Sequence, residues 1–294
     1  MSRLIPHLWY QDSLKEVFAL YSSVFAETQQ LYHSHLGGTP SGTVEMAAWL
    51  LEGLEIRVLS AQAPFHLTPS FSFLVACSTA EEVDEKYRQL SFGGTILMPL
   101  GSYSFSPRYA WVVDRYGLSW QLMDFSGREV TQRLILTLMY TSQVAGHCEE
   151  ALRHYCQLAR TSSIGEIDRY GSGFEPNLPN HIRHASFQLE NLVLAAMDSS
   201  AGHDFSFSEA ASLVVQVSSQ DELDHWWLAL SADPEAERCG WLKDRFGVSW
   251  QIVPQQLEAL MSSPDEAVRN RVRDAFLAMK KLNIATLEQA AIDQ

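Results

Sequence analysis

The sequence predicts an α+β protein made of two copies of one domain followed by C-terminal helices. A motif of eight residues, DRYGLSWQ at 114–121, returns as DRFGVSWQ at 244–251, which is 130 residues later. RLI at the start of the chain returns at the same offset. Each copy also reads as two rounds of a strand, a helix and three strands, or βαβββ. These repeats predict homologous domains at residues 1–128 and 129–254 and a helical tail at 255–294.

The first round of copy one opens with a strand at residues 4–10 and a helix after Ser13. Ser13 and Glu16 have the spacing of a capping box, in which a hydroxyl and a carboxylate bond free amides at a helix start. Apolar residues at helical spacing over 17–25 predict one buried side of this helix. Three strands complete the round, at 29–35, 43–51 and 54–61.

The second round of copy one follows the same order. A strand is predicted at 70–77, and Thr79 with Glu82 forms another capping box at a helix start. The last three strands are expected at 95–100, 109–113 and 119–123. In the closing motif, Gly117 supplies permissive backbone for a turn and Asp114 can bond nearby amides.

Copy two repeats this plan, with a helix at 148–158 and a capping box at Ser219 and Glu222. It is shorter than copy one between Leu230 and Cys239. Its strands are predicted at 134–141, 164–170, 182–189, 192–198, 213–217 and 249–254.

The tail is predicted to be helical and to pack on the second copy. Ser263 stands as the N-cap, Pro264 takes the first helical position and Glu266 the box position. An apolar stripe that includes Val272 follows. Two lysines at 280–281 would lie at the negative end of the helix dipole.

Composition excludes several classes of protein. The chain has 294 residues and 46% hydrophobic residues, with 21 Lys and Arg against 35 Asp and Glu, for a net charge of −14. Such a chain repels nucleic acid, and its apolar runs are too short to cross a membrane. Four scattered cysteines favour reduced thiols and a cytoplasmic protein. Nucleotide-binding glycine loops, zinc-protease motifs and serine-hydrolase motifs are missing from the sequence.

The polar residues on the predicted strands favour structural roles when taken singly. Gln121 alternates with apolar residues, and a hydrogen-bonded core amide is favoured over a group that lines a cavity. His7 shares a strand face with Trp9, where a lone histidine is more often a core or rim residue than a metal ligand. The other histidines form no closed constellation in the sequence, including the pairs His33 with His35 and His181 with His184.

Several segments together resemble one known family. These are IPHLWY at 5–10, the two DR[YF]G[LV]SWQ motifs, CGWLK at 239–243 and MKK at 279–281. They resemble the PhnB-like branch of the vicinal oxygen chelate superfamily, a branch named for 3-demethylubiquinone-9 3-methyltransferase. The resemblance covers nearly the whole chain and implies paired βαβββ modules that form glyoxalase-like cups. It does not predict methyl transfer, because the glycine loop for a methyl donor is missing and the fold class differs.

In the metal enzymes of this superfamily, the metal ligands lie on the first and closing strands of the modules. By resemblance, the matching positions are His7, Ser72 and Gln121 in copy one and Thr137, Ser212 and Gln251 in copy two. Only His7, with Gln121 or Glu55, could ligate a metal, whereas a stable site needs three or more good ligands. The sequence therefore departs from the metal-enzyme pattern.

The expected function is that of a metal-independent protein that binds a small molecule, or of an enzyme with an unassigned activity. One cup would offer Trp9, Trp111 and Gln121 with His7, and its twin Met139 and Gln251. The alternative is a lyase or dioxygenase of the glyoxalase type, in which His7, Glu55 and Gln121 bind a divalent metal. A third possibility is a structural or regulatory partner protein. The fused copies predict a monomeric pseudo-dimer, or a homodimer if the tail adds an interface.

Overall fold

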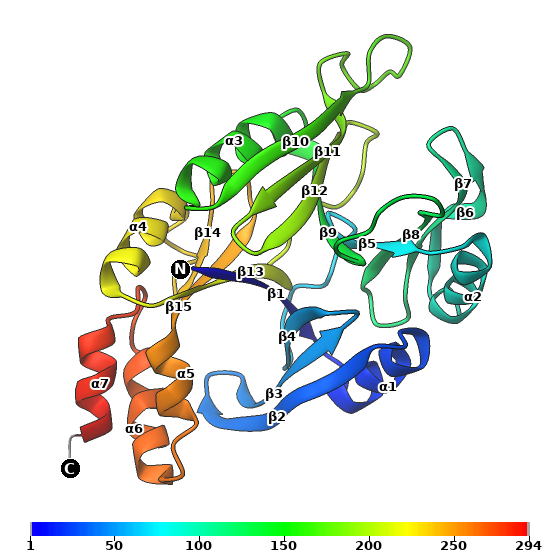
Figure 1. Ribbon diagram of the computed structural model, residues 1–294. Coiled ribbons are helices and arrows are strands. Elements are labelled where there is room, and N and C mark those ends of the chain that lie inside the picture. The colour runs from blue at the N-terminus through cyan, green and yellow to red at the C-terminus, as the bar shows by residue number, and fades with distance from the viewer. Residues whose placement is uncertain (1, 293–294) are drawn as a thin grey trace.

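The fold consists of two mixed β-sheets with helices packed between them (Figure 1), as seen in a computed structural model that describes residues 2–292. Sheet A has the strand order β14 (Trp241–Lys243), β15 (Ser249–Pro254), β13 (Ala211–Val217), β1 (Arg3–Tyr10), β4 (Leu54–Ser60), β3 (Gly42–Leu51) and β2 (Thr28–Thr39). Sheet B has the order β10 (Ser162–Arg169), β11 (Ile182–Leu189), β12 (Leu192–Ser199), β9 (Leu134–Thr141), β5 (Phe71–Cys77), β8 (Ser119–Asp124), β7 (Ser106–Val113) and β6 (Thr95–Tyr103). The predicted α+β class with two repeated domains is confirmed.

Sheet A takes four of its seven strands from copy one and three from copy two, and sheet B takes four strands from each copy. β1 of copy one runs antiparallel to β13 of copy two, and β5 of copy one runs antiparallel to β9 of copy two. The two copies therefore pair as two subunits of a dimer would, but within one chain. Residues that the repeat assigns to the same copy can consequently lie in different sheets.

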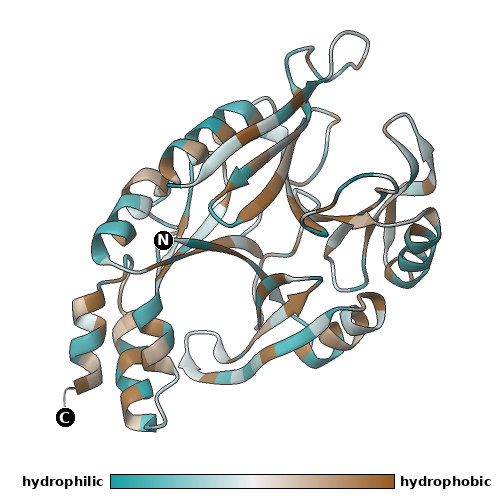
Figure 2. Ribbon diagram, in the orientation of Figure 1, coloured by the Kyte–Doolittle hydropathy of each residue, from teal (hydrophilic) through white to brown (hydrophobic). Residues whose placement is uncertain are grey.

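The buried apolar residues of both copies form one continuous hydrophobic core, in which the aromatic contacts described next lie within a copy. The strands of both sheets carry most of the apolar residues, whereas α2 is largely hydrophilic (Figure 2). In copy one, Tyr21 packs edge-on against Trp120 and Trp49, at centroid distances of 5.3 and 6.0 Å. In copy two, Tyr155 packs against Trp250 at 5.1 Å. The helices that cover the sheets are α1 (Leu14–Val24), α2 (Ala80–Leu90), α3 (Cys148–Leu158) and α4 (Gln220–Leu230), with a short 3-10 turn at Ser142–Val144.

The repeated DR[YF]G motif has a structural role in both copies. Asp114 accepts hydrogen bonds from the backbone amides of Tyr116 and Leu118, from the Trp120 indole at 2.8 Å and from the Tyr21 hydroxyl at 2.8 Å. Asp244 has the same four kinds of partner. Burial raises the pKa of both carboxyls, against the opposing effect of these hydrogen bonds. The motif therefore recurs because it joins a helix, a turn and a strand in each core.

Two of the predicted capping boxes form, whereas α1 begins after Ser13 as predicted but without its capping box, and α6 has a different N-cap. The Thr79 and Ser219 hydroxyls accept from the amides of Glu82 and Glu222. Ser13 is the N-cap of α1, but its side chain makes no capping bond. Instead, the Glu45 carboxylate on a neighbouring strand accepts from the Leu14 amide at 3.1 Å, so a tertiary contact replaces the local one.

The tail contains three helices, α5 (Gln255–Met261), α6 (Glu266–Leu277) and α7 (Ile284–Ile292). The N-cap of α6 is Asp265, which accepts from the Ala267 amide, so the prediction of Ser263 as N-cap was wrong by two residues. Lys280 and Lys281 lie beyond the end of α6 rather than in its last turn, and Lys281 pairs with Asp224 of α4. The tail therefore contacts copy two, as predicted, but α6 also contacts copy one, where Arg273 donates to the Gly37 carbonyl at 3.3 Å.

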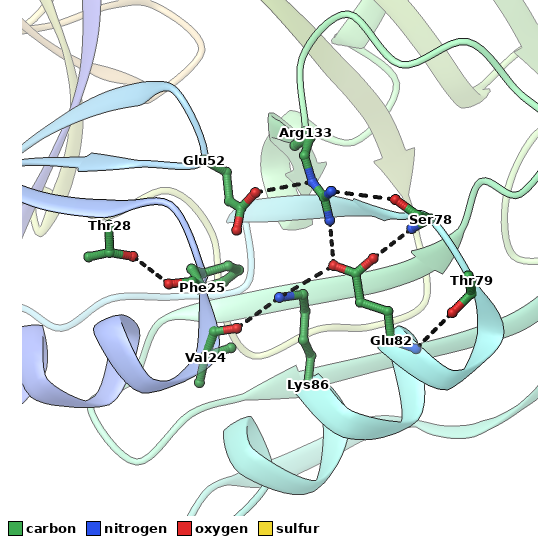
Figure 3. Close-up of polar contacts among 9 residues, drawn as sticks. All are labelled: Val24, Phe25, Thr28, Glu52, Ser78, Thr79, Glu82, Lys86 and Arg133. Atoms are coloured by element: carbon green, nitrogen blue, oxygen red, sulfur yellow. Dashed lines mark hydrogen bonds and ion pairs between the residues drawn. The ribbon is translucent and has the colours of Figure 1, made fainter.

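The linker between the copies is fixed by a network of charged groups around Arg133 (Figure 3). Its guanidinium pairs with Glu52 at 3.1 Å and also pairs with Glu82. Glu82 accepts in addition from the Ser78 amide at 2.7 Å, and Lys86 donates to the Val24 carbonyl at 2.8 Å. These contacts join the start of copy two to both rounds of copy one.

Over residues 2–292, no helix is both long and apolar enough to cross a membrane. The four cysteines are unpaired, and burial raises the pKa of all four thiols.

Candidate functional site: two cups with different chemistry

Each sheet has one face that packs on the core and one that does not. On β1, Leu4 and Leu8 belong to the core, so His7 and Trp9 lie on the opposite face. We call this face of sheet A the first cup and the corresponding face of sheet B the second cup. Figure 1 shows α5 and α6 standing beside the first cup, near β2.

The structure separates residues that the sequence analysis had grouped. His7, Trp9 and Gln251 belong to sheet A, whereas Trp111, Gln121 and Met139 belong to sheet B. The predicted grouping of His7 with Trp111 and Gln121 was therefore wrong, and so was the grouping of Met139 with Gln251. The physical reason is the exchange of strands between copies, which brings the first round of one copy beside the second round of the other.

The strand registers give the true counterparts in the two cups. In the first cup, His7 lies between Ser212 on β13 and Arg57 on β4. In the second cup, the same place is held by Thr137, between Ser72 and Ala195. The first cup therefore holds an imidazole and a guanidinium, where the second holds a hydroxyl and a methyl group.

His7 is the least usual side chain of the first cup. It is only 6% exposed, and its Nδ1 has no hydrogen-bond partner among the described residues. Burial, assisted by the positive charge of Arg57, lowers the pKa of His7 to about 3. The imidazole is therefore neutral at physiological pH, and its Nδ1 is an enclosed polar atom without a partner among the described residues.

Half-buried aromatic rings surround this imidazole. Trp241 on β14 lies edge-on to His7, with ring centroids 5.2 Å apart. The ring centroid of Trp9 lies 6.1 Å from that of Trp241 and 4.9 Å from that of Phe65. The Trp9 indole donates to the Ala61 carbonyl at 2.8 Å, which fixes its ring. The first cup thus offers rigid apolar faces beside a polar nitrogen.

Arg57 brings the C-terminal tail to the first cup. It is 3.5 Å from Glu55, which also pairs with Arg3 at 2.8 Å. Its guanidinium pairs in addition with Glu258 of α5, and Gln216 donates to the same carboxylate at 2.7 Å. A carboxylate from the tail thus lies against the one guanidinium that flanks His7 on β4.

In the second cup, the polar groups satisfy one another. The Gln121 amide donates to the Ser72 hydroxyl at 2.9 Å, and its oxygen accepts from the Tyr109 hydroxyl at 2.9 Å. The Trp111 indole donates to the Ser119 hydroxyl at 2.7 Å. This agrees with the interpretation of Gln121 as a hydrogen-bonded core amide. In the first cup, the Gln251 amide donates to the Ser212 hydroxyl in the same way. The repeat places Cys239 where copy one has Tyr109, 130 residues earlier.

The donors of the first cup do not fit the divalent metal that glyoxalase-type enzymes of this fold bind. Gln121, one of the three proposed ligands, lies in the other sheet. Glu55 is already engaged by Arg3 and Arg57. Arg57 itself places a positive charge beside His7, which disfavours a cation there. The remaining groups, Ser212 and Gln251, are neutral oxygen and amide donors, which are poor ligands for zinc, nickel or iron.

Sequence reasoning missed three contributors to the first cup, namely Arg57, Trp241 and Glu258. Arg57 lies on the same predicted strand face as Glu55, so the period of two could have indicated it. Trp241 belongs to the CGWLK segment that carried the family resemblance. Glu258 gives no local signal, because its place depends on how α5 packs.

The sequence comparisons agree with this architecture. The family model described as 3-demethylubiquinone-9 3-methyltransferase matches residues 2–123 and again residues 132–253. The chain is 35% identical to a PhnB protein from Bacillus cereus that carries the same methyltransferase description. That match covers 41% of this chain and 97% of the other, with a TM-score of 0.38. A search of curated proteins found no match.

Two longer structural matches cover both copies. A single-residue variant of glyoxalase I from Zea mays is 12% identical, with a TM-score of 0.56, over 86% of this chain and 93% of that chain. A Bacillus subtilis protein named as a candidate dioxygenase is 11% identical, with a TM-score of 0.50, over 98% and 96%. These two matches concern the fold alone. With both copies matched by its model, the chain belongs to the 3-demethylubiquinone-9 3-methyltransferase family.

Proposed function

We propose that the first cup binds a small organic molecule and does so without a metal ion in that cup. The observation that carries this proposal is the buried His7 imidazole, whose Nδ1 has no partner among the described residues. A buried polar atom without a partner costs free energy of about 1–3 kcal/mol, and a ligand that displaces the side chains covering it and bonds it recovers this cost. The second cup offers no such group at the same place, since Thr137 replaces His7.

The surroundings of His7 support a planar organic acid as the ligand. Trp9 and Trp241 present ring faces that are half-buried, which suits a flat apolar group. The Arg57 guanidinium suits a carboxylate, and the Glu258 carboxylate already rests on it. A molecule with a ring and an acid group would therefore meet the aromatic pair and the guanidinium together.

Thermal unfolding of the full chain tests this proposal with benzoate, 4-hydroxybenzoate and 1-naphthoate as probes and benzyl alcohol as the neutral control. Binding to the folded state raises the unfolding temperature. We expect the acids to raise it and benzyl alcohol to have a smaller effect. Replacing His7 with Ala should lower the affinity for the acids by about tenfold, since a hydrogen bond in a buried site contributes about 0.5–1.5 kcal/mol.

Thr137→Ala is the matched control, because Thr137 occupies the place of His7 in the second cup. This variant should respond to the acids as the wild type does. Acids that stabilise His7→Ala as strongly as the wild type would contradict the proposal, and so would acids that stabilise neither protein.

The glyoxalase-type alternative would need a metal in the first cup, which its donor set does not support. We also propose a cytoplasmic location, because the four unpaired cysteines suit a reducing compartment.

A further inference from the structure

A group of three metal-ligating side chains lies outside both cups, on the edge hairpin of sheet A. His33 and His35 lie on β2, and Glu45 lies on β3. One ligand atom from each of the three lies within 4.8 Å of the others. Within residues 2–292, this is the only group of three or more histidine, cysteine or acidic side chains placed so closely.

The strand geometry holds these side chains on one face. His33 and His35 are two residues apart on the same strand, and His35 pairs directly with Glu45 across the hairpin. Glu45 shares its face with Trp49, four residues along β3, which belongs to the hydrophobic core. The group therefore lies on the core side of the sheet, opposite the first cup, at the exposed margin beside the start of α1.

We propose that His33, His35 and Glu45 form a binding site for one zinc ion, with water completing the coordination. Zinc prefers imidazole nitrogen and carboxylate oxygen at about 2.0–2.2 Å in a tetrahedral arrangement, which places neighbouring ligand atoms about 3.3–3.5 Å apart. The His33 Nε2 and the Glu45 Oε1 are 2.8 Å apart, and the His33 and His35 ring centroids are 5.3 Å apart. Small side-chain rotations suffice to admit the ion, because both histidines are exposed.

The second oxygen of Glu45 supports this assignment. It accepts a hydrogen bond from the Leu14 amide at 3.1 Å, at the first residue of α1. Such an outer contact orients a ligating carboxylate and leaves its other oxygen for the metal. The missing side-chain cap at Ser13 has the same origin, because Glu45 takes over the amide that would otherwise need a local partner.

The charge around Glu45 also favours a cation. Among the described ion pairs, Glu45 contacts only His33, whereas Glu55 in the first cup is engaged by two arginines. The counterpart of Glu45 in copy two is Arg183. Each lies six residues before the leucine that precedes the matching turn, which is Leu51 in copy one and Leu189 in copy two. A guanidinium thus takes this place in the repeat and pairs with Asp168, so the fold does not require a carboxylate there.

Isothermal titration of the metal-free full chain with zinc chloride tests the site. We expect one zinc ion per chain, and a loss of affinity of about tenfold or more in each of His33→Ala, His35→Ala and Glu45→Gln. His35 is exposed and the Gln side chain can still accept from the Leu14 amide, so both variants should fold. Magnesium, which prefers oxygen ligands, should bind much more weakly than zinc.

His147→Ala is the matched control, because His147 and Glu150 form an exposed histidine and carboxylate pair without a third ligand. His7→Ala is a second control, which separates this site from the first cup. Both variants should bind zinc as the wild type does. Cobalt in place of zinc should give visible absorption bands that His35→Ala and Glu45→Gln lose. A wild-type chain that binds no zinc, or zinc binding that survives all three ligand substitutions, would overturn the proposal.

Discussion

At the scale of single residues, the two cups differ most at His7. The strand position of His7 and the alternation around it could be predicted, because a period of two is a local property of the sequence. Its neighbours could not be predicted. Arg57 and Ser212 reach it through pairing between strands that are far apart in the chain, and residue type alone does not reveal such pairing.

The buried state of His7 predicts a specific dependence of stability on pH. In the unfolded chain His7 takes a proton near its ordinary pKa of 6.5, whereas in the folded chain it does so only near 3. Between these values the unfolded state binds the extra proton, so the free energy of unfolding falls as the pH falls. From about pH 7 to about pH 5 we expect His7 to account for a loss of about 2 kcal/mol.

Urea unfolding of the wild type and of His7→Gln at both pH values measures this contribution. The variant lacks the titrating group. Its free energy of unfolding should therefore fall by about 2 kcal/mol less than that of the wild type between pH 7 and pH 5. Equal losses in the two proteins would show that His7 is protonated as readily in the folded chain as in the unfolded chain.

At the scale of helices and strands, local patterns predicted most elements well. The helix at 148–158 has the predicted bounds, because its apolar spacing and its neighbours agree. β14 was missed, since three residues are too few to show a period. The start of α6 differs from the prediction because the competing cap groups lie close together in sequence. The start of α1 is as predicted, but its capping group comes from another strand.

The capping contacts predict unequal effects of two similar substitutions. Thr79→Ala removes a hydroxyl that caps α2 and should lower the free energy of unfolding by about 1 kcal/mol. Ser13→Ala removes a hydroxyl that makes no capping bond, so it should change the free energy of unfolding by about 0.5 kcal/mol at most. Urea unfolding compares the two variants directly. A larger effect at Ser13 would mean that its hydroxyl, rather than Glu45, caps α1.

The contact of α5 with Arg57 predicts that the tail restricts the first cup. Glu258→Gln removes the negative charge that rests on the guanidinium. We expect faster amide hydrogen exchange in α5 and tighter binding of benzoate, because the acid no longer competes with a carboxylate of the chain. Glu288→Gln, on α7, serves as a matched change of charge elsewhere in the tail. Unchanged exchange and unchanged benzoate affinity in Glu258→Gln would contradict this role of α5.

At the scale of the whole molecule, the repeat predicted the fold class but not how the copies combine. Both possible pairings place the same residue types on the same strands, so a single sequence cannot distinguish them. What differs is the partner of His7, which is Ser212 of the other copy rather than Ser72 of its own. A monomer remains a prediction, and light scattering should give the mass of one chain, 33.1 kDa.

The central claim is that each cup is built from both copies. The most direct test is a set of nuclear Overhauser contacts between backbone amides in the perdeuterated full chain. We predict contacts from β1 to residues 211–216 of β13, and from β5 to residues 134–138 of β9. Contacts from β1 to β5 instead would place His7 with Ser72 and Gln121 in one cup and would contradict the account.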